Sequence, residues 1–203
     1  MKLRIEQDGR LCRIALSAPE NRNILDTPAC RELVQELRQA ASDDSTGAIL
    51  IEADGPVFCA GFEANTETEE ELLSIGSSIA KPIVAAVHGA AISGGLGLAA
   101  NAHVVVAAQG TSFGLTEIHE GRWSPALFEA VAAAMGERRA LELSLTGRIF
   151  SAPDAVAWGL AHHLAPAFEL DDRATQIATA LANANAYAVR AALATRAALK
   201  IET

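Results

Sequence analysis

The sequence has little cysteine, no lysine- or arginine-rich run and no long apolar run. Its three cysteines, Cys12, Cys30 and Cys59, are widely spaced and form no C-x-x-C pair. This spacing argues against a disulfide framework and against a zinc or other metal site, and it predicts reduced thiols. The formal net charge is −9 and no segment is basic, so we expect no nucleic-acid partner.

The apolar runs are too short to span a membrane, and no N-terminal stretch combines positive charge with an apolar segment. We therefore expect no membrane anchor, no targeting peptide and a cytoplasmic location. The chain has 203 residues, of which 50% are hydrophobic and 20% charged, as in compact globular proteins. No repeat or linker divides it, so we expect a single domain over residues 1–203.

Apolar strand-like runs alternate with helix-like segments through the first half of the chain, which predicts an α/β fold with a mostly parallel sheet. We expect strands at 11–19, 47–55, 81–89 and 104–108, and helices at 27–43, 69–80, 95–101, 124–136, 137–147, 151–160 and 171–200. Thr27 is the expected N-cap of the first helix, with Pro28 at its first position. The acidic stretch 63–71 reads as a solvated loop or an exposed helix start.

The stretch SGGLGLAA (93–100) places three glycines where a strand gives way to a helix. Gly95 and Gly97 fit the dinucleotide fingerprint G-x-G-x-x-[GA], but two strands precede them and no acidic residue ends the strand at 104–108. No Gly-Lys-Ser/Thr follows, as a P-loop requires, and Ser93 is not in a G-x-S-x-G nucleophile elbow. Close packing of strand and helix is the simplest interpretation of the glycines.

A third interpretation uses a second glycine turn, GPVFCAGFE (55–63), which also follows a buried strand. Ligands of open parallel sheets bind where the strands end, so two such turns can face each other across one crevice. Their backbone N–H groups then converge on one oxygen, which is how an oxyanion hole is made without a charged side chain.

The chain resembles the crotonase, or enoyl-CoA hydratase/isomerase, family. The motifs that carry the resemblance are PENRNILD (19–26), VFCAGFE (57–63), KPIVAAVHGAAISGGLGLA (81–99), FGLTEI (113–118) and ALELSLTGRIFSAPDAVAWGLAHHLAP (140–166). The resemblance implies a spiral of ββα units with a helical C-terminal part, usually assembled as a trimer or hexamer. It also implies an acyl thioester substrate, carried by coenzyme A or an acyl carrier, with no further cofactor.

In this family the two amides of an oxyanion hole match Phe62 and Gly94, and a catalytic glutamate matches Glu117. The resemblance places the substrate near the following residues: Asn23, Leu25, Ala60, Gly61, Gly95, Gly97 and His119. His119 could instead lie in a solvated loop. The second glutamate of family hydratases falls at Gly97 and is absent, so we expect a proton shuttle on Glu117, that is, isomerisation of a 3-enoyl thioester in preference to hydration.

Other functions stay open. A thioester decarboxylase or a carrier-linked enzyme of secondary metabolism needs the oxyanion hole more than two glutamates. A catalytically weak acyl-CoA-binding protein is a further alternative, because the chain ends at Thr203, before the last helices usual in the family. In the family those helices often contact a neighbouring subunit and close part of the coenzyme A site, so we expect a chain without them to differ in assembly and in coenzyme A binding. Fatty-acid metabolism is the expected context.

Overall fold

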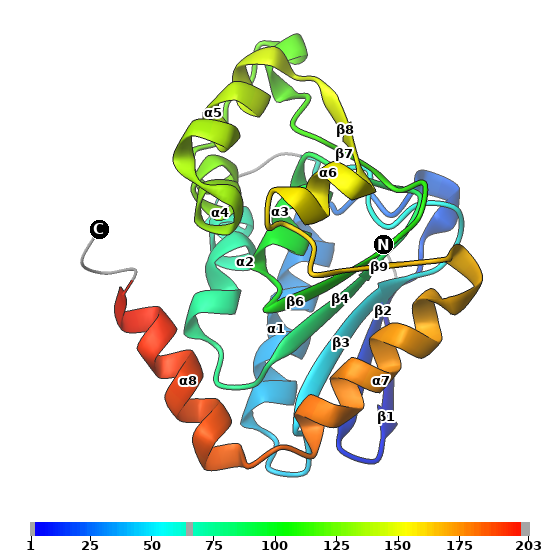
Figure 1. Ribbon diagram of the computed structural model, residues 1–203, viewed down its shortest axis with the longest axis vertical. Helices are drawn as coiled ribbons and strands as arrows, with labels where there is room; N and C mark the ends of the chain where they lie inside the picture. Colours follow the sequence, from blue (N-terminus) through cyan, green and yellow to red (C-terminus); the bar gives the residue numbers. More distant parts are fainter. Residues whose placement is uncertain (1–2, 64–66, 200–203) are drawn as a thin grey trace.

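The computed structural model describes residues 3–63 and 67–199. A six-stranded sheet forms its centre, with strand order β1-β2-β3-β4-β6-β9 (Figure 1). β1 is antiparallel to β2, and all other neighbours are parallel. The strands are β1 Leu3–Asp8, β2 Leu11–Leu16, β3 Ala48–Ala53, β4 Ile83–Val87, β6 Val104–Ala108 and β9 His163–Ala165. The prediction of an α/β fold with a mostly parallel sheet is confirmed.

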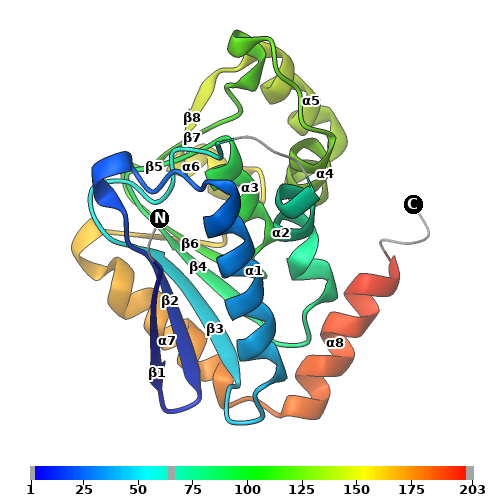
Figure 2. The same ribbon diagram turned by 180° about the vertical axis from the view of Figure 1, so that it is seen from behind.

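Helices cover both faces of this sheet. α1 (Thr27–Ser42) lies on one face and α7 (Leu170–Ala182) on the other, as the two opposite views show (Figures 1 and 2). Because successive side chains of a strand point to opposite faces, each inner strand supplies both cores. In β4, for example, Val84 packs in the core beneath α7, and Ala85 packs in the larger core on the α1 side.

The larger core continues into an upper layer of short elements, in which a three-stranded sheet has the order β5-β7-β8. In the sequence, β5 follows β4, β7 follows β6 and β8 follows α5. The elements concerned are α2 Glu67–Ser78, α3 Gly94–Asn101, α4 Pro125–Met135, α5 Glu137–Thr146, α6 Ala152–Ala157, β5 Ala90–Ile92, β7 Ser112–Gly114 and β8 Ile149–Ser151.

The start of α1 corrects one prediction. Asp26, not Thr27, is the N-cap, because its carboxylate accepts a hydrogen bond from the N–H of Ala29 at 2.8 Å. Thr27 and Pro28 are the first two helical residues. Proline is tolerated there because the first N–H groups of a helix have no intrahelical acceptor.

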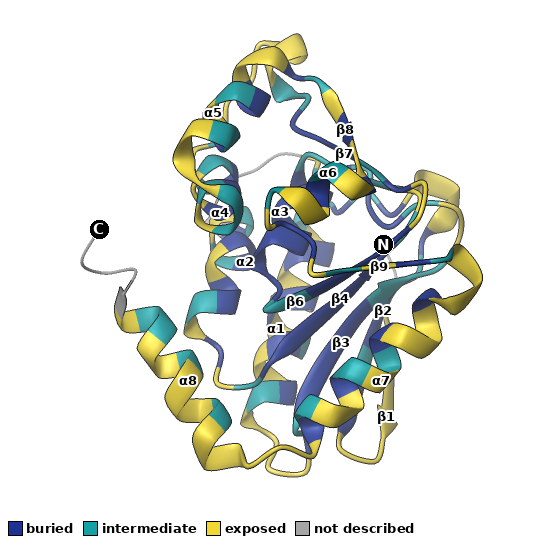
Figure 3. Ribbon diagram, in the orientation of Figure 1, coloured by how far each residue is buried: buried dark blue, intermediate teal, exposed yellow. Residues whose placement is uncertain are grey.

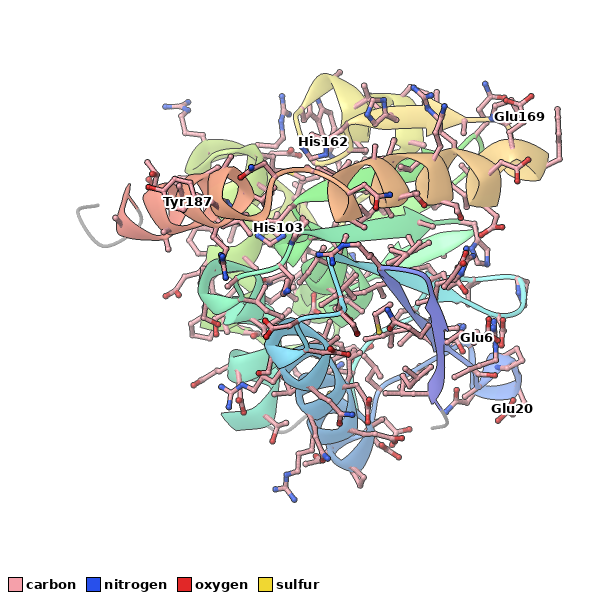
Figure 4. All side chains as sticks on the ribbon, turned by 90° about the horizontal axis from the view of Figure 1, so that it is seen from below. Glu6, Glu20, His103, His162, Glu169 and Tyr187 are labelled. Atoms are coloured by element: carbon pink, nitrogen blue, oxygen red, sulfur yellow. The ribbon has the colours of Figure 1, made fainter. Side chains whose placement is uncertain are left out.

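The prediction of one continuous helix over 171–200 is wrong. The segment is divided into α7 and α8 (Ala186–Leu199), and residue 200 lies outside the described residues. Asn185 causes the division: its Oδ1 accepts hydrogen bonds from the N–H groups of Tyr187 and Ala188, both at 3.1 Å, and so starts a new helix. α8 is mostly exposed (Figure 3). Along the layer formed by α7 and α8, Tyr187 on α8 and Glu169, which precedes α7, lie at opposite ends (Figure 4).

The three cysteines are all buried and free. Burial raises the pKa of the Cys59 thiol to about 12, so the sulfur stays protonated and unreactive. None of the helices in the described ranges has both the length and the apolar character to cross a bilayer.

Candidate active site

The two glycine turns lie side by side, at the ends of the neighbouring strands β3 and β4. Cys59 forms a parallel bridge with Ala91: the N–H of Cys59 donates to Ala90 O at 3.1 Å, and the N–H of Ile92 donates to Cys59 O at 3.0 Å. Phe58 adds a hydrogen bond to His88 O at 3.0 Å. The backbone therefore holds the turns together before any ligand is present.

The N–H group of Phe62 points away from the segment around Leu25, which pairs with it. Leu25 takes both bonds of a parallel bridge, donating to Gly61 O at 3.0 Å and accepting from the N–H of Glu63 at 2.9 Å. Phe62 lies between Gly61 and Glu63, and in a parallel pair the N–H group of such a residue points to the opposite side. Gly61, at φ +137°, adopts a conformation that side chains rarely allow.

The amide of Gly94 is free for a different reason. Gly94 is the first residue of α3, where N–H groups have no intrahelical acceptor and the helix dipole is positive. Ser93 precedes it with φ +56°, a strained conformation for a residue with a side chain. Among the described residues, no backbone carbonyl accepts from the N–H of Phe62 or Gly94.

Phe62 and Gly94 both line one cavity of about 430 Å³. Its walls include Ala60 and Gly61 beside Phe62, and Gly94 beside the ring of Phe62. Glu117 lines the same cavity from a third segment. The structure thus brings together all three residues for which a catalytic role is predicted, and two of those for which substrate contact is predicted.

Glu117 begins the 3₁₀ turn Glu117–Glu120, directly after β7. The turn closes on the backbone of Glu117, whose carbonyl accepts from the N–H of Arg122 at 3.0 Å. The side chain is half-buried. In the described part of the chain its carboxylate has no hydrogen-bond donor or ion-pair partner, which leaves it available to a ligand.

Four further glutamates line the cavity besides Glu117, namely Glu63, Glu69, Glu70 and Glu120; of these, Glu69 and Glu70 lie on α2. Ser124 Oγ donates to Glu69 Oε1 at 3.3 Å and accepts from the N–H of Leu127 at 3.2 Å, so that the N-cap of α4 holds Glu69. Burial raises the pKa of Glu69; the bond from Ser124 lowers it, and the negative charge of Glu117 raises it. A helix starts in the acidic stretch 63–71, as one of the two expectations had it, because α2 begins at Glu67; Glu69 in this stretch is only partly exposed, and residues 64–66 lie outside the described residues.

Comparison with known proteins decides the family. The sequence model of the family described as enoyl-CoA hydratase/isomerase matches residues 6–200. This chain belongs to the enoyl-CoA hydratase/isomerase family.

Individual relatives agree with the family match. The rat protein named enoyl-CoA hydratase domain-containing protein 3, mitochondrial, is 29% identical over 192 residues, which make up 88% of this chain and 64% of the rat protein. The chain therefore spans less than two thirds of that relative. Enoyl-CoA hydratase EchA19 of Mycobacterium tuberculosis is 28% identical, with 93% of this chain and 77% of the relative covered.

A solved structure gives the same fold. The crystal structure of an enoyl-CoA hydratase from Mycobacterium tuberculosis superposes with a TM-score of 0.86 at 27% identity, covering 99% of this chain and 91% of that one. The crotonase fold predicted from the motifs is confirmed. These names say hydratase, so the preference for isomerisation that was drawn from Gly97 has no support in them.

Asn23 and Leu25 do not line the cavity of this family member, although we expected substrate contact there. Both are fully buried. Asn23 Nδ2 donates to Asp54 O and Val57 O, each at 2.9 Å, and its Oδ1 accepts from the N–H of Ala18 at 2.8 Å. The side-chain polar groups of Asn23 are occupied by backbone groups, and Asn23 and Leu25 both lie behind the cavity wall.

Gly95 and Gly97 also lie outside the cavity lining. A Cβ atom on Gly95 would overlap the carbonyl of Cys59, so this glycine lets helix and strand approach closely. A Cβ atom on Gly97 would overlap Leu73 and come within 2.6 Å of Leu127 Cδ1. The position at which family hydratases carry their second glutamate is therefore filled by leucines of α2 and α4.

The histidines lie outside the cavity lining. His119, expected near the substrate or in a solvated loop, is exposed in the turn Glu117–Glu120, which agrees with the second expectation, and its Nε2 lies within 3.2 Å of Gly147 O. His103 and His162 (Figure 4) accept through Nδ1 from the N–H groups of Ile83 and Val105, at 2.9 and 3.0 Å, and so bond the starts of strands. Burial lowers the pKa of His162, which favours the neutral ring that this acceptor role requires.

Proposed function

We propose that this chain converts enoyl thioesters of coenzyme A, with the thioester oxygen held by the N–H groups of Phe62 and Gly94 and with Glu117 exchanging a proton at C2. The observation that carries the proposal is that Phe62, Gly94 and Glu117 line a single cavity, and that among the described residues no backbone carbonyl accepts from either amide and no side chain pairs with the carboxylate. Amides placed where an enolate oxygen forms stabilise it without reorganisation, and each such donor contributes about 3 kcal/mol.

Hydration of a 2-enoyl thioester is the first reaction in this proposal. The relatives cited above are named hydratases, and the cavity is lined by further carboxylates besides Glu117, among them Glu69. Isomerisation of a 3-enoyl thioester is the second candidate. It needs only one carboxylate, and Gly97 favours it because the usual second glutamate is missing.

Turnover of both substrate types tests the proposal. The protein and its Glu117→Gln variant are mixed with 2-enoyl-CoA and 3-enoyl-CoA of several chain lengths, and products are followed by mass spectrometry and absorbance. A gain of one water by the 2-enoyl thioester establishes hydration, and conversion of the 3-enoyl thioester at constant mass establishes isomerisation. The variant is expected to lose either activity by a factor of about 10² to 10⁴. Binding of both thioesters without turnover would contradict the proposal and favour a binding protein.

Several expectations remain predictions. An acyl-carrier thioester could replace the coenzyme A ester in the same cavity, and a trimeric or hexameric assembly could complete it. The cytoplasmic location and the link to fatty-acid metabolism also stay predictions. Size-exclusion chromatography with light scattering tests the assembly, and paired assays with acyl-CoA and acyl-carrier substrates test the carrier.

A further inference from the structure

We infer that Glu69 is the second catalytic carboxylate of this site, supplied by α2 in place of the one that Gly97 cannot provide. The inference rests on the proposed function. Glu69 lines the cavity that Phe62, Gly94 and Glu117 also line. It reaches the cavity from α2, whereas the family position at Gly97 belongs to α3.

The packing around Gly97 explains why the carboxylate comes from elsewhere. Leu73 occupies the space beside Gly97, and Leu73 lies four residues after Glu69 on the same helix. Side chains four residues apart on a helix lie on one face. α2 therefore places Leu73 beside Gly97 and, one helical turn earlier, places Glu69 at the cavity.

Ser124 fixes the orientation of Glu69. The Ser124 hydroxyl accepts from the N–H of Leu127, so its own proton is left for Glu69, at an Oγ to Oε1 distance of 3.3 Å. A carboxylate held in this way by a helix cap loses little rotamer freedom when substrate binds. Outside the cavity, α2 also carries Glu71, which pairs with Arg38 and makes no contact with the site.

The charges around Glu69 suit a base. Besides burial, the negative charges of Glu117 and Glu70 raise the pKa of Glu69, and the positive charge of Arg122 lowers it. Burial and the charge of Glu117 raise the pKa of Glu69 above its ordinary value. A base whose pKa lies nearer the working pH takes a proton more effectively.

The step proposed for Glu69 is the activation of water. Its carboxylate takes a proton from water as the water oxygen bonds to C3 of a 2-enoyl thioester. The electron pair of the C2–C3 double bond moves into the enolate, whose oxygen is held by the amides of Phe62 and Gly94. Glu117, in its protonated form, then gives its proton to C2. Solvent exchange returns the proton from Glu69 to Glu117, and the net reaction is addition of one water.

The test separates the two carboxylates by two readouts on the same protein. Hydration of 2-butenoyl-CoA measures both, whereas exchange of the C2 protons of butanoyl-CoA with deuterium oxide needs only the amides and Glu117. In Glu69→Gln we expect hydration to fall by a factor of about 10² to 10⁴, with exchange within threefold of the unmodified protein. Glutamine keeps an acceptor for Ser124, so the fold is expected to persist. Glu71→Gln on the same helix is the control, with both rates unchanged.

The outcomes are distinct. Hydration by Glu69→Gln at the rate of the control would overturn the role of Glu69 while leaving the proposed function in place. So would isomerisation of 3-butenoyl-CoA without any hydration by the unmodified protein. Failure of the unmodified protein in both exchange and turnover would overturn the proposed function, and the role of Glu69 with it. Recovery of part of the hydration rate in Glu69→Asp would support a carboxylate function at this position.

Discussion

The ring of Phe62 packs directly on Gly94, so closely that a Cβ atom on Gly94 would overlap it. The two residues proposed to form the oxyanion hole therefore also position each other. Phe62 follows the turn after β3, and Gly94 begins α3. A change at either one is transmitted to both amides.

A methyl group at Gly94 tests this dependence. Gly94→Ala displaces the Phe62 ring and with it the two N–H groups, so we expect turnover of enoyl-CoA to fall by a factor of about 10² to 10³. Steady-state kinetics on the purified variant measure the loss. The melting temperature is recorded beside it, and a folded variant that keeps full activity would contradict the proposed position of the oxyanion hole.

Restoring the usual family glutamate is expected to fail. Gly97→Glu places a carboxylate against Leu73 and Leu127, both buried, so overpacking and burial of a polar group should lower the free energy of unfolding by about 3 kcal/mol or more. Urea unfolding measures the change. A gain of hydration activity without loss of stability would show that the leucines make room easily.

The stability of Glu69→Gln should depend on pH. The pKa of Glu69 is raised in the folded protein, so its stabilising contribution is complete below its unfolded pKa and is lost as the pH rises through the folded value. Because glutamine does not titrate, the variant should gain stability relative to the unmodified protein as the pH rises from the ordinary glutamate pKa through the raised folded value. Chemical unfolding at several pH values across this range measures the difference. A constant difference would argue against a desolvated carboxyl group.

Arg22 borders the cavity, is exposed and has no ion-pair partner within residues 3–63 and 67–199. It is suited to the phosphates of coenzyme A. We expect Arg22→Ala to raise the KM for coenzyme A thioesters roughly tenfold, as for a lost hydrogen bond to a charged group, with kcat unchanged. The thioester of N-acetylcysteamine, which lacks phosphate, is the control substrate. An equal rise in KM for both substrates would assign Arg22 to the wall of the cavity instead.

The inner strands and most helices could be predicted from the sequence because their apolar residues show a clear pattern. β1 could not, since only Leu3 of its six residues is buried, and an exposed edge strand carries no hydrophobic alternation. β5 has three residues, too few for a periodic signal. The division at 183–185 does have a signal, an asparagine before an alanine-rich run, which N-cap chemistry explains.

The family motifs predicted Phe62, Gly94 and Glu117 as site residues, and the structure brings all three to one cavity. Glu69 could not be found in this way, because it lies in an acidic stretch that is typical of a solvated surface. Its spacing of four residues from Leu73 was the available signal, but the spacing gives a helix face and not what that face meets. Only the packing of α2 against α3 and α4 places that face at the cavity.

Proton exchange at C2 tests the central claim most directly. Butanoyl-CoA is incubated with the protein in deuterium oxide, and deuterium at C2 is followed by nuclear magnetic resonance, with Glu117→Gln in parallel. We predict exchange far above the rate without protein, and its loss by a factor of at least about 10² in the variant. Exchange at the rate without protein, or undiminished exchange in the variant, would contradict the account.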